Sequence, residues 1–116
     1  MRYQYDEITP KFTTYQAENN LALVLEDENG WTHSVLTVNL VNETLSNDNC
    51  AFIDINNCGD YVLGWLERNN FGQLTGRHGL SGFCVYPEFE FKQEIINKYR
   101  MNSTELEFLE KEVFNV

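Results

Sequence analysis

The chain has 116 residues, of which 42% are hydrophobic and 14% aromatic, and this apolar content argues against overall disorder and for one domain spanning residues 1–116. Eight Lys and Arg residues against eighteen Asp and Glu residues give a net charge of −10, which argues against direct binding to nucleic-acid phosphates. No apolar run approaches the roughly 20 residues of a membrane span, and MRYQYDEITP lacks a signal-peptide core, so we expect a cytoplasmic protein that contacts no membrane.

The segment from Phe12 to Leu40 is predicted to form a β-hairpin. LALVL, at residues 21–25, is apolar at every position, which is typical of a strand buried on both faces. The acidic EDENG segment that follows ends in Asn-Gly, a strong turn signal. The return strand, WTHSVLTVNL, is rich in Val and Thr and carries His33, which we expect to be a half-exposed strand residue.

A third strand, CAFIDIN, is predicted at residues 50–56 after a polar loop at residues 42–49. Alternation would place Cys50, Phe52 and Asp54 on one face, where a buried aspartate needs a partner. Residues 57–70 predict a short amphipathic helix, because Cys58, Val62, Trp65 and Leu66 recur at helical spacing.

The rest of the chain predicts a loop, a strand and helical segments. GQLTGRHGLSG, at residues 72–82, is glycine-rich and predicts an irregular loop. FCVYPEFEF resumes a strand pattern in which Pro87 indicates a bulge, edge or bend, and residues 92–100 and 104–113 predict helices. The resulting order indicates an α+β fold: a small antiparallel sheet of about four strands, one central short helix and a C-terminal helical segment.

All three cysteines lie between residues 50 and 84, and the odd number in an intracellular chain argues against disulfides. Thiolate and imidazole are ligands that zinc prefers, so one interpretation is a closed structural zinc site. Its candidate ligands are Cys50, Cys58, His78 and Cys84, with Asp54 as an alternative oxygen ligand. The spacing contains no C-x2-C knuckle, and the other interpretation is that the cysteines only fill the core.

No arrangement of side chains indicates catalysis, because no cysteine–base signature is present and TGRHGLSG lacks the phosphate-loop pattern. We therefore do not expect an enzyme. The carboxylates form two groups, which are either a solvated surface or a surface that binds a basic groove of a partner protein. They are Glu26, Asp27 and Glu28 in one segment and Glu105, Glu107, Glu110 and Glu112 in the other.

Three segments, LALVLEDENGWTHSVLTVNL, NCAFIDINNC and TGRHGLSGFCVYPEFEF, resemble the domain-of-unknown-function 4313 family of small proteins from mobile elements and phage-related regions of Gram-positive bacteria. Together they cover roughly Leu21 to Phe91. The resemblance implies an inhibitor of host defence, since such mobile-element proteins include some that are similar to type II anti-CRISPR proteins. Those are small acidic proteins that bind Cas9, and at least one such group contains zinc, which would suit the cysteines here.

The expected function is therefore inhibition of a host defence nuclease by direct binding, with Cas9 as the implied partner and loading of guide or target DNA as the blocked step. A DNA mimic that inhibits a restriction enzyme would share the acidity. A third alternative is a zinc-stabilised accessory protein with no inhibitory role. In the two inhibitory cases the partner is a protein with a basic surface, and neither nucleic acid nor a membrane is bound directly.

Overall fold

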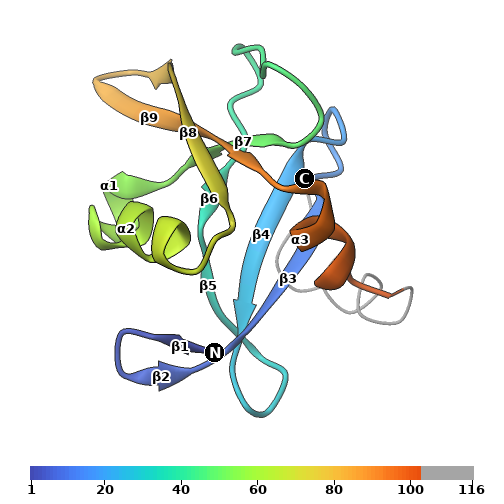
Figure 1. Ribbon diagram of the computed structural model, residues 1–116. Helices are drawn as coiled ribbons and strands as arrows, with labels where there is room; N and C mark the ends of the chain where they lie inside the picture. The colour runs from blue at the N-terminus through green and yellow to red at the C-terminus, as the bar shows by residue number, and fades with distance from the viewer. Residues whose placement is uncertain (103–116) are drawn as a thin grey trace.

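Three antiparallel sheets and three short helices make up residues 1–102, the part of the chain that the computed structural model describes (Figure 1). The sheets have the strand orders β1-β2, β3-β4-β5 and β6-β7-β9-β8. In chain order the elements are β1 Arg2–Tyr3, β2 Asp6–Glu7, β3 Thr9–Thr14, β4 Leu21–Glu26, β5 Thr32–Val35, β6 Thr37–Val38, β7 Cys50–Ile53, α1 Ile55–Cys58, α2 Tyr61–Arg68, β8 Gly72–Ser81, β9 Cys84–Phe91 and α3 Gln93–Lys98.

The continuous apolar run of β4 is confirmed as a strand buried on both faces. Leu21, Leu23 and Leu25 belong to the main hydrophobic cluster, and Ala22 and Val24 belong to a second, smaller cluster. The predicted turn at residues 26–30 is also confirmed, and it joins β4 to β5. The turn is held locally, because Asp27 Oδ1 accepts the amides of Asn29 at 2.9 Å and Trp31 at 3.0 Å.

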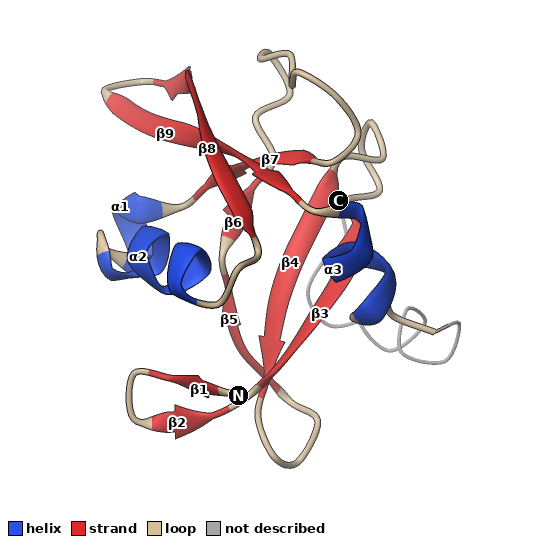
Figure 2. Ribbon diagram, viewed as in Figure 1, coloured by secondary structure: helices blue, strands red, loops and turns tan. Residues whose placement is uncertain are grey.

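The α+β class with antiparallel pairing is confirmed, but the expected single sheet of about four strands is wrong (Figure 2). The irregular loop expected at residues 72–82 is also wrong, since Gly72–Ser81 form β8 and pair with β9 from Gly72↔Phe91 to Ser81↔Cys84. The glycines that suggested a loop instead allow the bulge within β8 and the turn that follows it. Gly76 has φ +88° inside a bulge between Leu74 and His78, and Gly82, with φ +60°, opens the two-residue turn to β9.

The helix predicted over residues 57–70 is two helices, α1 and α2, because Gly59 ends α1 with φ +77°. Figure 2 shows them on one side of the molecule and α3 on the other. α3 confirms the helix expected after residue 92, and the predicted segment at residues 104–113 lies outside the described residues. In the described part of the chain, no helix has the length and apolar character needed to cross a membrane.

Aromatic rings fill much of the main core, which joins the sheets to α2 and α3. Phe12 and Phe91 meet edge to face with ring centroids 5.1 Å apart, and Trp65 and Phe71 lie 5.3 Å apart. The Trp65 indole N–H donates to the Arg2 carbonyl at 2.7 Å, which ties the β1–β2 hairpin to α2. His33 lies on β5 as expected, with Nε2 2.8 Å from Oδ2 of Asp6.

The strand predicted at residues 50–56 is shorter than expected, because β7 ends at Ile53 and α1 begins at Ile55, but the two faces of β7 are divided as the alternation predicts. Ala51 and Ile53 belong to the main core, and Phe52 is buried outside that cluster, on the other face. Asp54, 8% exposed, meets its predicted need for a partner as the N-cap of α1, where Oδ2 accepts the Asn57 side-chain amide at 2.8 Å. Phe52 lies against Gly79 of β8, whose missing side chain leaves it room.

Replacing Gly79 with Ala should destabilise the fold by about 1–3 kcal/mol, because the interior is already filled there. The new Cβ would lie 2.6 Å from Leu40 Cδ1 and 2.9 Å from Phe52 Cε1, and both of those side chains are buried. Urea unfolding monitored by circular dichroism measures the change. Gly64→Ala in α2 is the matched control, since its Cβ meets only the flexible end of Arg68, and it should be neutral or stabilising by up to about 1 kcal/mol. Equal effects of the two substitutions would contradict this packing.

Candidate functional site

A fully buried carboxylate, that of Glu88 on β9, lies beneath the loop of residues 41–49. Its Oε1 accepts the hydroxyls of Ser46 and Thr75, each at 2.7 Å. Its Oε2 accepts the Ser46 amide at 2.8 Å and the Arg77 guanidinium Nη1 at 2.9 Å. Both oxygens are therefore hydrogen-bonded, although the residue is 0% exposed.

Arg77 links this carboxylate to the loop. Its Nη1 also donates to Ser46 Oγ at 2.8 Å, and its Nη2 donates to the Thr44 carbonyl at 2.9 Å. The β8 bulge between Leu74 and His78 contains Arg77, so the irregular register directs its side chain toward Glu88. The irregular loop predicted at residues 72–82 gave no indication that Thr75 and Arg77 bind Glu88 as an internal anion.

The pKa of Glu88 is lower than its usual value of 4.5 despite the burial. Burial by itself raises the pKa because it penalises the charged form. The hydrogen bonds from Thr75 and Ser46 and the charge of Arg77 lower it by more. The carboxylate is therefore ionised in the folded protein at neutral pH, and its charge holds the loop in place.

Further contacts fix both halves of the 41–49 loop. The Leu80 amide donates to Glu43 Oε1 at 3.0 Å, and the Asn47 side-chain amide donates to Glu90 Oε2 at 2.8 Å. Asn47 Oδ1 accepts the Asn49 amide at 2.9 Å, which closes a local turn before β7. The polar loop predicted from composition is thus ordered, and it covers the face of the four-stranded sheet that points away from the main core.

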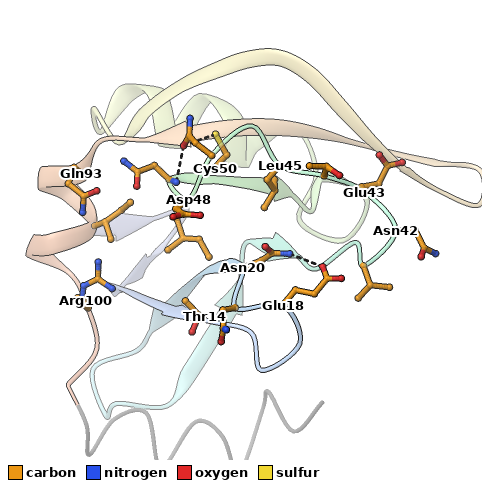
Figure 3. Close-up of a pocket in the computed structure, with 17 residues that line it drawn as sticks. Thr14, Glu18, Asn20, Asn42, Glu43, Leu45, Asp48, Cys50, Gln93 and Arg100 are labelled. Carbon is orange, nitrogen blue, oxygen red and sulfur yellow. Dashed lines mark hydrogen bonds between the residues drawn. The ribbon is translucent and has the colours of Figure 1, made fainter.

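A cleft of about 700 Å³ opens between this loop, the β3–β4 turn and α3 (Figure 3). Figure 3 shows Gln93 and Arg100 at one end of the cleft, Glu18 and Asn20 along one wall, and Glu43 on the loop opposite. Most of the lining is polar. It comprises Thr14, Glu18, Asn19, Asn20, Leu21, Val41, Asn42, Glu43, Thr44, Leu45, Asn47, Asp48, Asn49, Cys50, Gln93, Ile96 and Arg100.

The β3–β4 turn is an unusual wall because two residues other than glycine adopt left-handed backbone conformations. Glu18 has φ +65° and Asn19 has φ +56°, which is uncommon for a glutamate. The Asn39 side chain holds the turn: it donates to the Ala17 carbonyl at 3.2 Å and accepts from the Asn20 side chain at 2.9 Å. The surrounding hydrogen bonds therefore impose this shape at a conformational cost.

Arg100 is positioned by the backbone on either side of it. The Phe12 amide donates to the Tyr99 carbonyl at 2.8 Å, and the Met101 amide donates to the Phe12 carbonyl at 2.9 Å. Within residues 1–102, neither Arg100 nor Asp48 has a side-chain hydrogen bond or ion pair. Among the described residues, the cleft thus contains one carboxylate and one guanidinium that no other side chain pairs.

The predicted zinc ligands are not brought together. Cys50 pairs with Glu90 of β9 and Cys84 lies six residues before Glu90 on that strand, so the backbones of the two cysteines are roughly 20 Å apart at a strand's rise per residue. His78 is exposed in the middle of β8, opposite Pro87. Among residues 1–102 there is no cluster of three or more His, Cys, Asp or Glu side chains that could hold a metal ion.

The surroundings of two of the thiols favour the protonated form. Burial, with a smaller contribution from the nearby Glu88 charge, raises the pKa of Cys50 to about 11. Burial and the Asp54 charge raise the pKa of Cys58, whose Sγ donates to the Val35 carbonyl at 3.6 Å. The strand register, which separates Cys50 from Cys84, is what keeps the predicted four-ligand set from forming a closed tetrahedral site in this arrangement.

The acidic groups predicted to bind a partner lie away from the cleft or outside the described residues. Glu26, Asp27 and Glu28 lie at the β4–β5 turn, the opposite end of the sheet from the β3–β4 turn. Asp27 is occupied in capping that turn. Glu105, Glu107, Glu110 and Glu112 fall outside the described residues. The cleft acids Glu18, Glu43 and Asp48 were missed because their sequence spacing carries no signal.

The fold and the site define a small α+β protein with an ordered polar cleft and no evident catalytic arrangement in its described residues. The model of a family described as Domain of unknown function (DUF4313) matches residues 9–113, and the chain belongs to this family. The matched region includes every residue that lines the cleft and the whole Glu88 network. Comparison with curated proteins and with solved structures gives no significant match.

The lowered pKa of Glu88 predicts a specific loss of stability in acid. Because its pKa is lower in the folded than in the unfolded protein, the stabilisation is complete above about pH 4.5 and is lost as the pH falls through the folded-state value. The unfolding free energy of the wild type should therefore decline more steeply below about pH 4.5 than that of Glu88→Gln. Urea titrations at a series of pH values measure both slopes, and parallel slopes would contradict the assignment.

The separated thiols predict that the protein holds less than one equivalent of zinc and unfolds at the same temperature with and without a chelator. Metal analysis after purification without added zinc, and thermal unfolding with EDTA, test this. The zinc-site interpretation of the sequence predicts the opposite result. One equivalent of zinc that is lost in Cys84→Ser, with a lower melting temperature, would contradict the described arrangement.

Proposed function

We propose that this protein acts by binding a basic segment of a partner protein in the cleft, and that it catalyses no reaction. The observation that carries the proposal is the chemistry of the cleft wall. Its lining contains three carboxylates and six side-chain amides and one cation, Arg100. The carboxylates are Glu18, Glu43 and Asp48, and the amides are Asn19, Asn20, Asn42, Asn47, Asn49 and Gln93.

Lysine and arginine side chains suit this lining, because they only donate hydrogen bonds and carboxylate and amide oxygens accept them. Asp48 has no partner within the described residues and is therefore open to such a donor. The amide N–H groups and Arg100 can meet the backbone carbonyls of the same segment. The cleft thus favours an extended basic loop over a phosphate-rich ligand.

The ordered walls support binding as well. Glu88, Arg77 and Ser46 hold the loop side, and Asn39 holds the turn side. A preformed cleft loses little conformational freedom when it is filled, which leaves more of the contact energy for affinity. The complete hydrogen bonding of the Glu88 carboxylate therefore favours binding, because it keeps the loop wall of the cleft in place before a partner arrives.

The net charge of −10 indicates the class of partner. A strongly negative protein is steered toward basic surfaces, and enzymes that process nucleic acids hold them in positively charged channels. Cas9 is the first candidate, in keeping with the resemblance to inhibitors carried by mobile elements, and blocked loading of guide or target DNA is the proposed effect. A restriction enzyme is the second candidate, because it would present the same basic chemistry.

The test combines a Cas9 DNA-cleavage assay with binding measured by size-exclusion chromatography. The Glu18→Lys, Asp48→Lys double variant should weaken inhibition and binding by roughly tenfold or more, since it reverses two charges in the cleft. Glu28→Lys, Glu67→Lys is the charge-matched control on exposed residues outside the cleft, and it should change affinity by less than about threefold.

The outcomes test separately which protein is the partner and whether the cleft binds a basic segment. Full cleavage at a large molar excess of this protein removes Cas9 as the partner, and the same assay with a restriction enzyme tests the second candidate. A fluorescein-labelled peptide rich in Lys and Arg tests the cleft itself. Equal peptide affinity for the cleft and control variants would overturn the proposed function.

A further inference from the structure

The tip of the β8–β9 hairpin carries an exposed apolar surface that the proposed function does not use. Phe83, in the two-residue turn, is 106% exposed, and Leu80 and Val85 are 60% and 45% exposed. Single exposed apolar residues are common, but three within six positions of one hairpin form a patch. Figure 1 shows this hairpin projecting from the body of the molecule.

The three side chains have complementary shapes. Leu80 and Val85 are directly opposed in the register of β8 and β9, so their side chains lie next to each other on the same face of the hairpin. Phe83 projects from the turn beyond them, next to Gly82. The hairpin therefore carries both a projecting ring and a surface against which such a ring can pack.

Contacts at the base of the tip hold it in place. The Leu80 amide donates to Glu43 Oε1 at 3.0 Å, and the Asn56 side chain donates to the Val85 carbonyl at 3.3 Å. An apolar surface on a hairpin fixed from both sides loses little freedom when it is covered.

The distribution of acidic residues bears on which partner can approach the hairpin tip. Eighteen of the 116 residues are acidic, yet residues 68–87 contain no Asp or Glu. Two copies of a chain with a net charge of −10 repel one another over most of their surfaces. Along this hairpin the repulsion is reduced, because Glu43, the carboxylate bound at the tip, accepts the Leu80 amide at 3.0 Å and salt at physiological concentration screens charges beyond roughly 8 Å.

We propose that the hairpin tip is a contact between two copies of this chain, related by a two-fold axis. Each Phe83 packs on the Leu80–Val85 surface of the other copy, so one pairing satisfies both apolar features at once. The contact is small and the dimer is weak and concentration-dependent, as expected for an interface below the standard size.

Sedimentation velocity of the full chain tests the proposal over about 1 µM to 1 mM, the range in which weak association is measured. The wild type should shift from monomer to dimer within this range, and Phe83→Ser and Val85→Ser should remain monomeric. Tyr5→Ser, which removes a 92% exposed aromatic side chain from the β1–β2 turn, is the matched control and should still dimerise. Because Phe83 is fully exposed, its substitution should leave the melting temperature unchanged.

Salt gives a second readout. Dimerisation should strengthen as sodium sulfate is added, because the net charges are screened and the apolar contact is reinforced, whereas binding of a basic peptide in the cleft should weaken. A wild type that remains monomeric at about 1 mM overturns the proposal, and the tip is then left for a different protein. Dimers that persist in Phe83→Ser and Val85→Ser overturn it as well, because association then uses another surface.

Discussion

The buried carboxylate of Glu88 is the constraint on which the functional surface depends. An ionised group without exposure is costly unless it is fully hydrogen-bonded, and here the loop supplies Ser46 while the β8 bulge supplies Thr75 and Arg77. The loop and the bulge are thereby held against one another. The loop in turn forms one wall of the cleft, so the shape of the cleft follows from satisfying one charge.

The molecule separates its polar and apolar surfaces in space. The cleft concentrates carboxylates and amides between the 41–49 loop and the β3–β4 turn, and the hairpin tip is apolar, with no Asp or Glu among residues 68–87. Glu43 connects them, because it lines the cleft and accepts the Leu80 amide at the tip. Salt acts in opposite directions on the two proposed contacts, which makes them separable in one set of measurements.

Local patterns predicted the elements whose burial is decided locally. The apolar run at residues 21–25 was interpreted correctly, and the strand predicted at residues 50–56 was correct in its alternation as far as Ile53, because the strand period alone determines which faces are covered. Composition misled at residues 72–82. A glycine-rich polar segment usually indicates a loop, but here Gly76 permits a bulge within the strand. Gly79 makes room for Phe52, a residue that is remote in sequence.

The sequence by itself determined the α+β class, the central strands, the excess of negative charge and the family, because these depend on composition and on short periodic patterns. Only the tertiary structure decided the division into three sheets, the separation of Cys50 from Cys84 and the convergence of Glu18, Glu43 and Asp48 on one cleft. Those features depend on strand register and on how loops cross a sheet. Register and loop paths are set by pairs of residues far apart in the chain, such as Arg77 with Thr44 and Glu88 with Ser46, and no local pattern encodes such pairs.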